Sequence, residues 1–84
     1  MNHCINRRQY QKLLAQFFIE KRTLAGVTMK DAADFIMVDD QIFQEFEEGH
    51  RQLIPHRLYA LAMLYGVSRQ EFNEAIKQPR FWSM

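Results

Sequence analysis

The sequence predicts one small all-α domain built from five helices. Apolar residues recur three and four positions apart along most of the chain, which is the spacing of an amphipathic helix. No segment alternates apolar and polar residues in the way that a half-buried strand does. Glycine and proline fall between the periodic segments, where they end one helix or begin the next. Because 84 residues supply only one hydrophobic core, we assign residues 1–84 to a single domain.

The first helix is expected over residues 6–22. Its predicted inner stripe consists of Tyr10, Leu13, Leu14, Phe17 and Leu24, with Lys21 as the one polar member. Phe18 fits that stripe less clearly. Gly26 is expected to end this unit, because glycine adopts the left-handed conformation that commonly follows a helix.

A short second helix is expected over residues 29–36. Thr28 stands where an N-cap is needed, and its hydroxyl can accept a hydrogen bond from an unpaired N–H of the first turn. The residues that this helix should bury are Ala32, Ala33 and Ile36. Met37 and Val38 form a tight break after it.

The third helix is expected over roughly residues 40–48, with Asp39 as its N-cap. Phe43 and Phe46 lie three positions apart and should form its buried side. Gly49 is expected to end it.

Two further helices complete the prediction after a connection over residues 50–54. Proline suits the first turn of a helix, where its missing N–H costs nothing, so the fourth helix should begin at Pro55. Its inner face consists of Leu58, Leu61, Ala62 and Tyr65. Residues 68–71 have the form of a capping box for a fifth helix, which buries Phe72, Ala75 and Ile76. Pro79 ends that helix, and a short aromatic tail occupies residues 79–84.

Charge is distributed unevenly along the chain. Residues 1–30 hold six Lys/Arg and one Glu, a net charge of +5. Residues 31–50 hold seven carboxylates and no Lys/Arg, a net charge of −7, and residues 51–84 return to +3. The expected third helix is therefore the most acidic part of a chain whose total charge is only +1.

Several residues in the middle of the chain form a pattern typical of one fold. Ala33 is small where two short helices would cross, and Phe43 and Phe46 form an apolar pair under the second of them. Glu47-Glu48-Gly49 and the run RLYALAMLYGVS follow at the right spacing. Over residues 8–77 the chain thus resembles the lambda-repressor-like helix-turn-helix domain of the Xre/Cro family, with the motif at about residues 28–48. The family usually has glycine where this chain has Met37, and a methionine there adds backbone strain.

The resemblance implies a site that binds double-stranded DNA. By position, the base contacts would be Asp40, Gln41, Gln44 and Glu45. The contacts to the DNA backbone would be Arg7, Arg8, Lys12, Thr28, Met29, Lys30, His50 and Arg51. A homodimer would place two third helices about 34 Å apart on a two-fold operator. Ile42, Phe81 and Trp82 are the residues that we expect at a partner or dimer surface.

The acidity of the third helix is unusual for a helix that reads DNA. A glutamine amide can pair with adenine, but a row of carboxylates near phosphates is repelled. Asp39 suits a helix N-terminus, and we expect Glu47 to hold the third helix to an arginine or to backbone groups. These roles leave Asp40, Glu45 and Glu48 unexplained.

Two hypotheses of different classes follow. The first is a small DNA-binding transcriptional regulator of the Xre/Cro type. The second is a protein-interaction module with the same fold, whose acidic third helix binds and inhibits a basic partner protein without binding DNA. An antiactivator, a phage inhibitor or an antitoxin would fit the second hypothesis.

Other classes of function have little support in the sequence. His3 and Cys4 stand near the N-terminus, and His50 and His56 lack the paired spacing of a zinc site, so we expect no metal. No glycine-rich phosphate loop or nucleophile constellation is present, so we expect no cofactor and no enzymatic activity. No apolar run is long enough to span a bilayer or to act as a signal peptide, which predicts a cytoplasmic protein.

Overall fold

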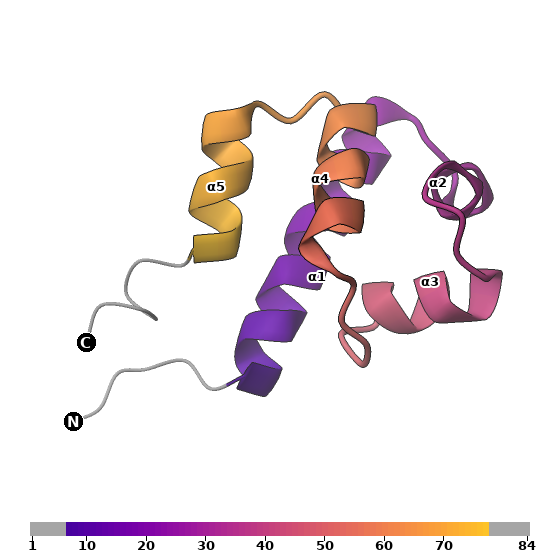
Figure 1. The fold of residues 1–84 in the computed structure, drawn as a ribbon, viewed down its shortest axis with the longest axis horizontal. Coiled ribbons are helices and arrows are strands. Elements are labelled where there is room, and N and C mark those ends of the chain that lie inside the picture. The colour runs from indigo at the N-terminus through magenta and orange to yellow at the C-terminus, as the bar shows by residue number, and fades with distance from the viewer. Residues whose placement is uncertain (1–6, 78–84) are drawn as a thin grey trace.

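The computed structural model describes residues 7–77, which form five helices and no strand (Figure 1). The helices are α1 (Arg7–Ala25), α2 (Met29–Phe35), α3 (Asp40–Glu47), α4 (Pro55–Leu64) and α5 (Arg69–Lys77). The all-α prediction is confirmed for this part of the chain. The predicted tail at 79–84, with Phe81 and Trp82, lies outside the described residues.

The helices begin where the sequence provides caps. The Oγ1 atom of Thr28 accepts a hydrogen bond from the backbone N–H of Asp31 at 3.1 Å. The Oδ1 atom of Asp39 accepts one from the N–H of Gln41 at 2.9 Å. Each contact satisfies a donor that the first helical turn leaves unpaired, so α2 and α3 begin at the predicted residues. The larger difference is in α1, which continues to Ala25 instead of ending at residue 22.

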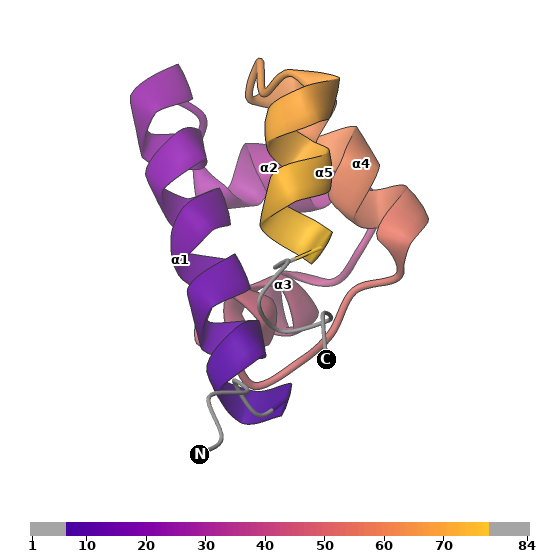
Figure 2. The same ribbon diagram turned by 90° about the vertical axis from the view of Figure 1, so that its left-hand side faces the viewer.

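The long helix α1 passes behind α4 in the view of Figure 1, lies along one side of the molecule in Figure 2, and makes its main contacts with α3, α4 and α5. The short helices α2 and α3 pack on each other at the end of the molecule away from α5, and α2 also contacts α4. This arrangement leaves one side of the α2–α3 pair facing outward.

Phe18 is the centre of the hydrophobic core, with no exposed surface. Its ring centroid lies 5.8 Å from that of Phe46 in α3 and 6.5 Å from that of Phe72 in α5. It also lies 6.4 Å from the ring of Tyr65, the residue that ends α4. One side chain of α1 therefore packs against residues from three other elements, at distances typical of aromatic pairs.

The predicted inner stripe of α1 is confirmed for Leu14, which is buried, and for Tyr10 and Phe17, which pack against the core, but it is wrong for Leu13 and Leu24. Leu13 is 43% exposed and Leu24 is 76% exposed, whereas Leu14, Ala15 and Phe18 are buried. Both stripes satisfy helical spacing, because apolar residues occupy adjacent positions along this helix. The choice between them depends on which residues meet α3, α4 and α5. Lys21, assigned to the stripe, instead lies at its edge and pairs with Glu71 of α5 at 2.8 Å.

Four of the helices end in the same hydrogen-bonded motif, in which the chain turns through a left-handed residue. Three of these residues are glycines, and the fourth is Met37 after α2, with a φ of 60°. The N–H of Met37 donates to Asp34 O at 3.1 Å, and the N–H of Val38 donates to Ala33 O at 3.0 Å. Met37 therefore occupies a conformation that a residue with a side chain adopts at an energetic cost, as the sequence predicted.

Replacing Phe18 with alanine should lower the free energy of unfolding by about 3 to 5 kcal/mol, because it leaves a cavity between four elements. Leu24→Ala on the same helix should cost less than about 0.5 kcal/mol, since that side chain is exposed. Urea denaturation of both variants measures the difference. An equal decrease in the free energy of unfolding for the two variants would favour the predicted stripe, in which Leu24 faces inward.

Candidate functional site

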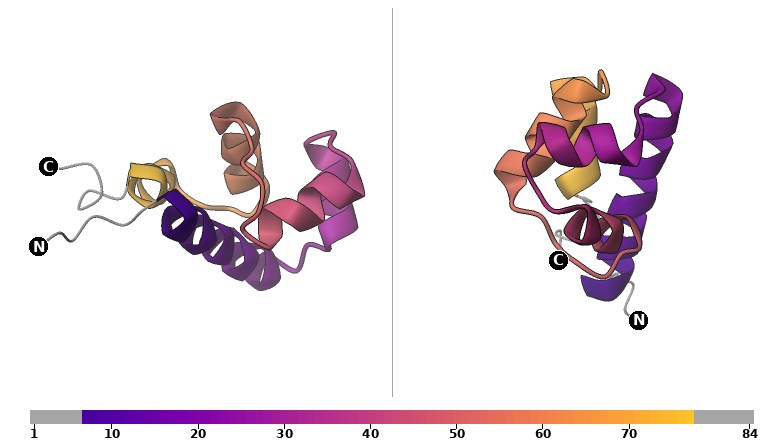
Figure 3. Two further views of the ribbon diagram at one scale, coloured as in Figure 1. Left: turned by 90° about the horizontal axis from the view of Figure 1, so that it is seen from below. Right: turned by 90° about the vertical axis from the view of Figure 1, so that its right-hand side faces the viewer.

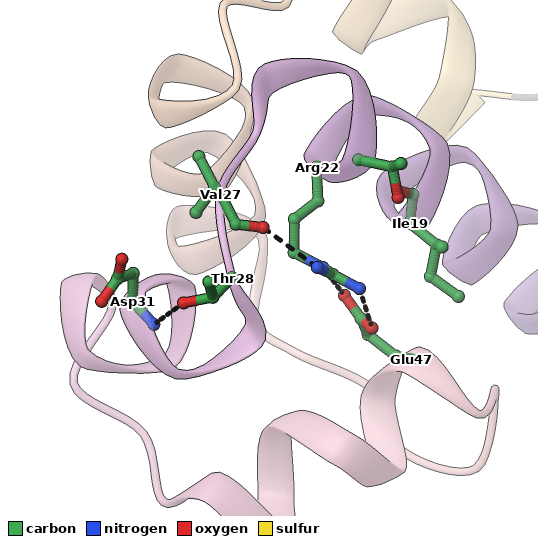
Figure 4. A network of polar contacts seen from close by, with 7 residues as sticks. Ile19, Arg22, Val27, Thr28, Asp31 and Glu47 are labelled. Atoms are coloured by element: carbon green, nitrogen blue, oxygen red, sulfur yellow. Dashed lines mark hydrogen bonds and ion pairs between the residues drawn. The ribbon is translucent and has the colours of Figure 1, made fainter.

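An ion pair between α1 and α3 fixes the position of α3 (Figure 4). The Nε atom of Arg22 donates to Glu47 Oε2 at 2.7 Å, and its Nη2 atom donates to Oε1 at 3.1 Å. The side chains are only 16% and 6% exposed. The Nη1 atom of Arg22 also donates to the carbonyl of Val27 at 3.0 Å, in the segment that leads into α2. One guanidinium thus holds the end of α3 and the entry to α2 together, and Glu47 has the structural role expected for it.

The outer face of α3 carries a row of polar side chains. It consists of Asp40, Gln41, Gln44, Glu45 and Glu48, which are exposed except for the partly buried Glu45. Phe43 and Phe46 on the opposite face are 1% and 3% exposed and pack into the core. In the right-hand view of Figure 3, α2 and α3 lie in front of the other helices. The residues expected to face DNA bases therefore share one accessible surface.

Most polar groups of this row already bind one another. The Nε2 atom of Gln41 donates to Glu45 Oε2, and that of Gln44 donates to Glu48 Oε2, both at 3.1 Å. The Nε atom of Arg51 donates to Glu45 Oε1 at 2.7 Å. The amide of Gln41 and the guanidinium of Arg51 both lower the pKa of Glu45, so this carboxylate stays charged.

Two groups of expected phosphate-contacting residues lie beside this row. Met29 and Lys30, at the start of α2, line a hollow together with Asp40 and Gln44 of α3. Lys30 is highly exposed and lies 3.8 Å from Asp34, a distance at which an exposed pair contributes little. Its ammonium is therefore available to a phosphate near the N-terminus of α3.

The second group forms a basic hollow where α1 meets the end of α3. It is lined by Arg8, Gln11, Lys12, Gly49 and His50. A Cβ atom on Gly49 would lie 2.9 Å from the Cγ atom of Lys12, so only glycine allows this close approach. The structure thus brings His50 beside Arg8 and Lys12, which lie one turn apart on α1 and far from His50 in the sequence.

The other residues expected at the site differ in position and in contacts. Thr28 uses its hydroxyl to cap α2, and Arg7 is exposed at the start of α1. Arg51 contacts Glu45, as described above. Ile42 is partly buried and points away from the row, into a hollow that it shares with Met37 and Ile54.

The contacts account for Glu45, one of the three carboxylates that the sequence left unexplained, and give partners or positions to other acidic residues of the segment. Glu47 pairs with Arg22, Glu45 with Arg51, and Asp34 with Lys30. Asp39 caps α3, while Asp31 and Asp40 lie in first turns, where the positive end of the helix dipole favours a carboxylate. Glu48 contacts the amide of Gln44 but no cation among the residues described.

Two arginines that shape the site were not identified from the sequence. Arg22 is four positions from Phe18, so the correct inner stripe of α1 would have placed it toward α3. Arg57 donates from its Nε atom to the carbonyl of Ile36 at 2.9 Å and so satisfies an acceptor at the end of α2. Nothing in the local sequence around Arg57 indicates this long-range contact.

No protein-family model matches this sequence, and no curated protein matches it. Within residues 7–77, no three histidine, cysteine or acidic side chains gather as a metal ion would require. His3 and Cys4 lie outside the described residues. None of the described helices combines the length and apolarity that crossing a bilayer requires.

Glu47→Ala should lower the free energy of unfolding by about 3 kcal/mol, because it leaves the largely buried Arg22 without its partner. Glu48→Ala, at the next position on the outer face, should change it by less than about 0.5 kcal/mol. Thermal or urea denaturation measures both. A similar small effect for the two variants would mean that the ion pair does not hold α3.

The Glu45 carboxyl should titrate below the ordinary value of 4.5 when followed by NMR. Because its pKa is lowered in the folded chain, its pairing favours the folded state above that pH and is lost as the pH falls through the lowered pKa. Gln41→Ala or Arg51→Ala should raise the titration midpoint toward 4.5. Arg69→Ala removes a cation from α5 and serves as the control, which should leave the midpoint unchanged.

Proposed function

We propose that the chain is a small DNA-binding transcriptional regulator with a lambda-repressor-like helix-turn-helix fold. In this proposal α2, the turn at Met37 and Val38, and α3 form the motif. The outer face of α3 enters the major groove of double-stranded DNA, and a dimer places two such helices on a two-fold operator.

The observation that carries the proposal is the exposed face of α3 with cations on both sides of it. Gln41 and Gln44 stand on consecutive turns and can reach base edges, where an amide pairs with adenine. Lys30 lies at one end of the face, and the basic hollow lies at the other end. Phosphates on the two sides of a groove would meet these cations, while base edges meet the row between them.

The internal hydrogen bonds of the row lower the electrostatic cost of this arrangement. Glu45 is paired with Arg51, so the two together carry no net charge toward DNA. Gln41 donates its amide hydrogen to Glu45, which leaves its carbonyl oxygen to accept from an amino group of adenine or cytosine. The face can therefore bind bases without first losing all of its own contacts.

Selection from a pool of random DNA duplexes tests the proposal. The wild-type chain should enrich a two-fold sequence, and its affinity should fall steeply with salt. Gln41→Ala should weaken binding to that sequence by about 1 to 3 kcal/mol and relax the preference at one base pair. Lys12→Ala should weaken binding to all sequences and reduce the salt slope by about one.

Arg69→Ala is the matched control for Lys12→Ala, because it removes the same charge from an exposed position at the start of α5. It should leave both affinity and salt slope nearly unchanged. Wild-type chain that binds no duplex at low salt, or that binds all sequences equally, would contradict the proposal.

One observation favours a second candidate function, the binding of a basic protein. From Thr28 to Arg51 the sequence has only two lysine or arginine residues, Lys30 and Arg51, and Arg51 is paired with Glu45. Asp40 and Glu48 remain exposed with no cation paired to them among the described residues, and could contact lysine or arginine on a partner.

The variant Asp40→Lys distinguishes the two candidates. If α3 binds DNA, the added cation should strengthen attraction to phosphate and make the fall of affinity with salt steeper. If α3 binds a basic protein, the same change should abolish capture of that protein by the full chain. Thr23→Lys, on the exposed surface of α1, serves as a control for the added charge.

A further inference from the structure

An apolar patch lies beside α3, on the side away from its polar row. We call it the turn patch, and it consists of Met37, Val38, Ile42, Leu53 and Ile54, which line one open hollow. Met37 is 81% exposed and Ile54 is 55% exposed. Large apolar side chains are thus held in solvent at a place where the α2–α3 turn and the connection to α4 come together.

Met37 is unfavourable there for two separate reasons. Its backbone has a φ of 60°, the left-handed region that costs energy for any residue with a Cβ atom. Glycine occupies the equivalent position at the ends of α1, α3 and α4, so the same turn forms without a side chain. Its side chain also has little contact with the core, because most of it is exposed. Folding therefore gains nothing evident from a methionine at this position, and strain of this kind often accompanies function.

The charges around the turn patch select among the partners that could cover it. Asp39 and Arg57 both line the hollow, so its border carries a carboxylate and a guanidinium. Arg51 also lines it, but is paired with Glu45. A strongly basic partner would meet Arg57, and a strongly acidic one, DNA included, would meet Asp39. A surface with both signs suits a partner with both signs.

We propose that the turn patch binds the turn patch of a second copy of the chain. In a two-fold dimer the same surface serves both subunits, so apolar residues meet apolar residues. The carboxylate of one copy can then approach the guanidinium of the other. Met37 and Ile54 would be the central side chains, since burying exposed apolar groups supplies most of the energy of such a contact.

The turn patch includes Ile42 of α3 but no member of its polar row, although Arg51, which pairs with Glu45 of the row, lines the same hollow. Asp40, Gln41 and Gln44 are absent from the lining of the turn patch. Two copies joined through this hollow would therefore not need to bury Asp40, Gln41 or Gln44. The inference agrees with the proposed function but does not depend on it, because association is measured without DNA.

Sedimentation equilibrium of the wild-type chain and of Met37→Gly tests the inference. Wild type should form a dimer in a concentration-dependent manner. Met37→Gly should raise the dissociation constant at least about tenfold, a loss that corresponds to one apolar contact of this size. The same variant should raise the urea midpoint of the monomer, since glycine removes the strain at a positive φ.

Only this proposal expects Met37→Gly to stabilise the folded chain and at the same time to weaken its association. A variant that merely damages the fold would lower both quantities. Ile54→Asn should weaken association as Met37→Gly does. Leu24→Ala and Met63→Ala remove other exposed apolar side chains, 76% and 61% exposed, and should leave the dissociation constant unchanged.

Several results would overturn the proposal. One is a wild-type chain that stays monomeric up to about 1 mM, where even a weak contact of about 4 kcal/mol would be populated. Another is a dimer whose dissociation constant is the same in Met37→Gly as in the wild type. A dimer that is lost in Phe81→Ala or Trp82→Ala but kept in Met37→Gly would assign the interface to the C-terminal tail instead.

Discussion

The ion pair between Arg22 and Glu47 is the contact on which the position of α3 depends. It joins the last turns of α1 to the last turn of α3, and the same guanidinium holds the carbonyl of Val27 before α2. A largely buried pair like this one adds little net stability but penalises any arrangement that separates its members. Because both short helices are held from one point on α1, the outer face of α3 has a defined orientation. Phe18, also on α1, packs against Phe46 of α3, Tyr65 at the end of α4 and Phe72 of α5, and so joins α3 to the other helices.

Carboxylate side chains have three different roles in the acidic segment, residues 31–50. Asp39 accepts a backbone hydrogen bond and begins a helix, and Glu47 orients that helix from its buried end. Glu45 lies on the surface, where it orders the side chains of Gln41 and Arg51. A count of charges treats these carboxylates as equal, although only the exposed and unpaired ones repel an anion. The face of α3 therefore repels phosphate less than its number of carboxylates indicates, although it is less basic than most surfaces that bind DNA.

Met37 lowers the stability of the folded chain at a position where glycine would form the same turn. Three other helix ends in the chain use glycine in the same left-handed turn, which shows that the motif itself needs no side chain. A methionine adds backbone strain and an exposed apolar group beside Ile54. Such a residue weakens the isolated subunit and is retained most simply if the side chain is buried by association. Stability and assembly would then be set by one position of the turn between α2 and α3.

The sequence by itself determined that residues 7–77 form five helices and where α2, α3 and α4 begin, although α1 continues past its predicted end to Ala25. Caps such as Thr28 and Asp39 act within one turn of chain, so nearby residues suffice to predict them. Only the tertiary structure decided which stripe of α1 faces inward, because two adjacent stripes satisfy the same period and packing selects Phe18. It also decided which partner Glu47 takes. Contacts between residues that are distant in sequence depend on how whole helices are oriented, and the spacing of apolar residues does not predict that orientation.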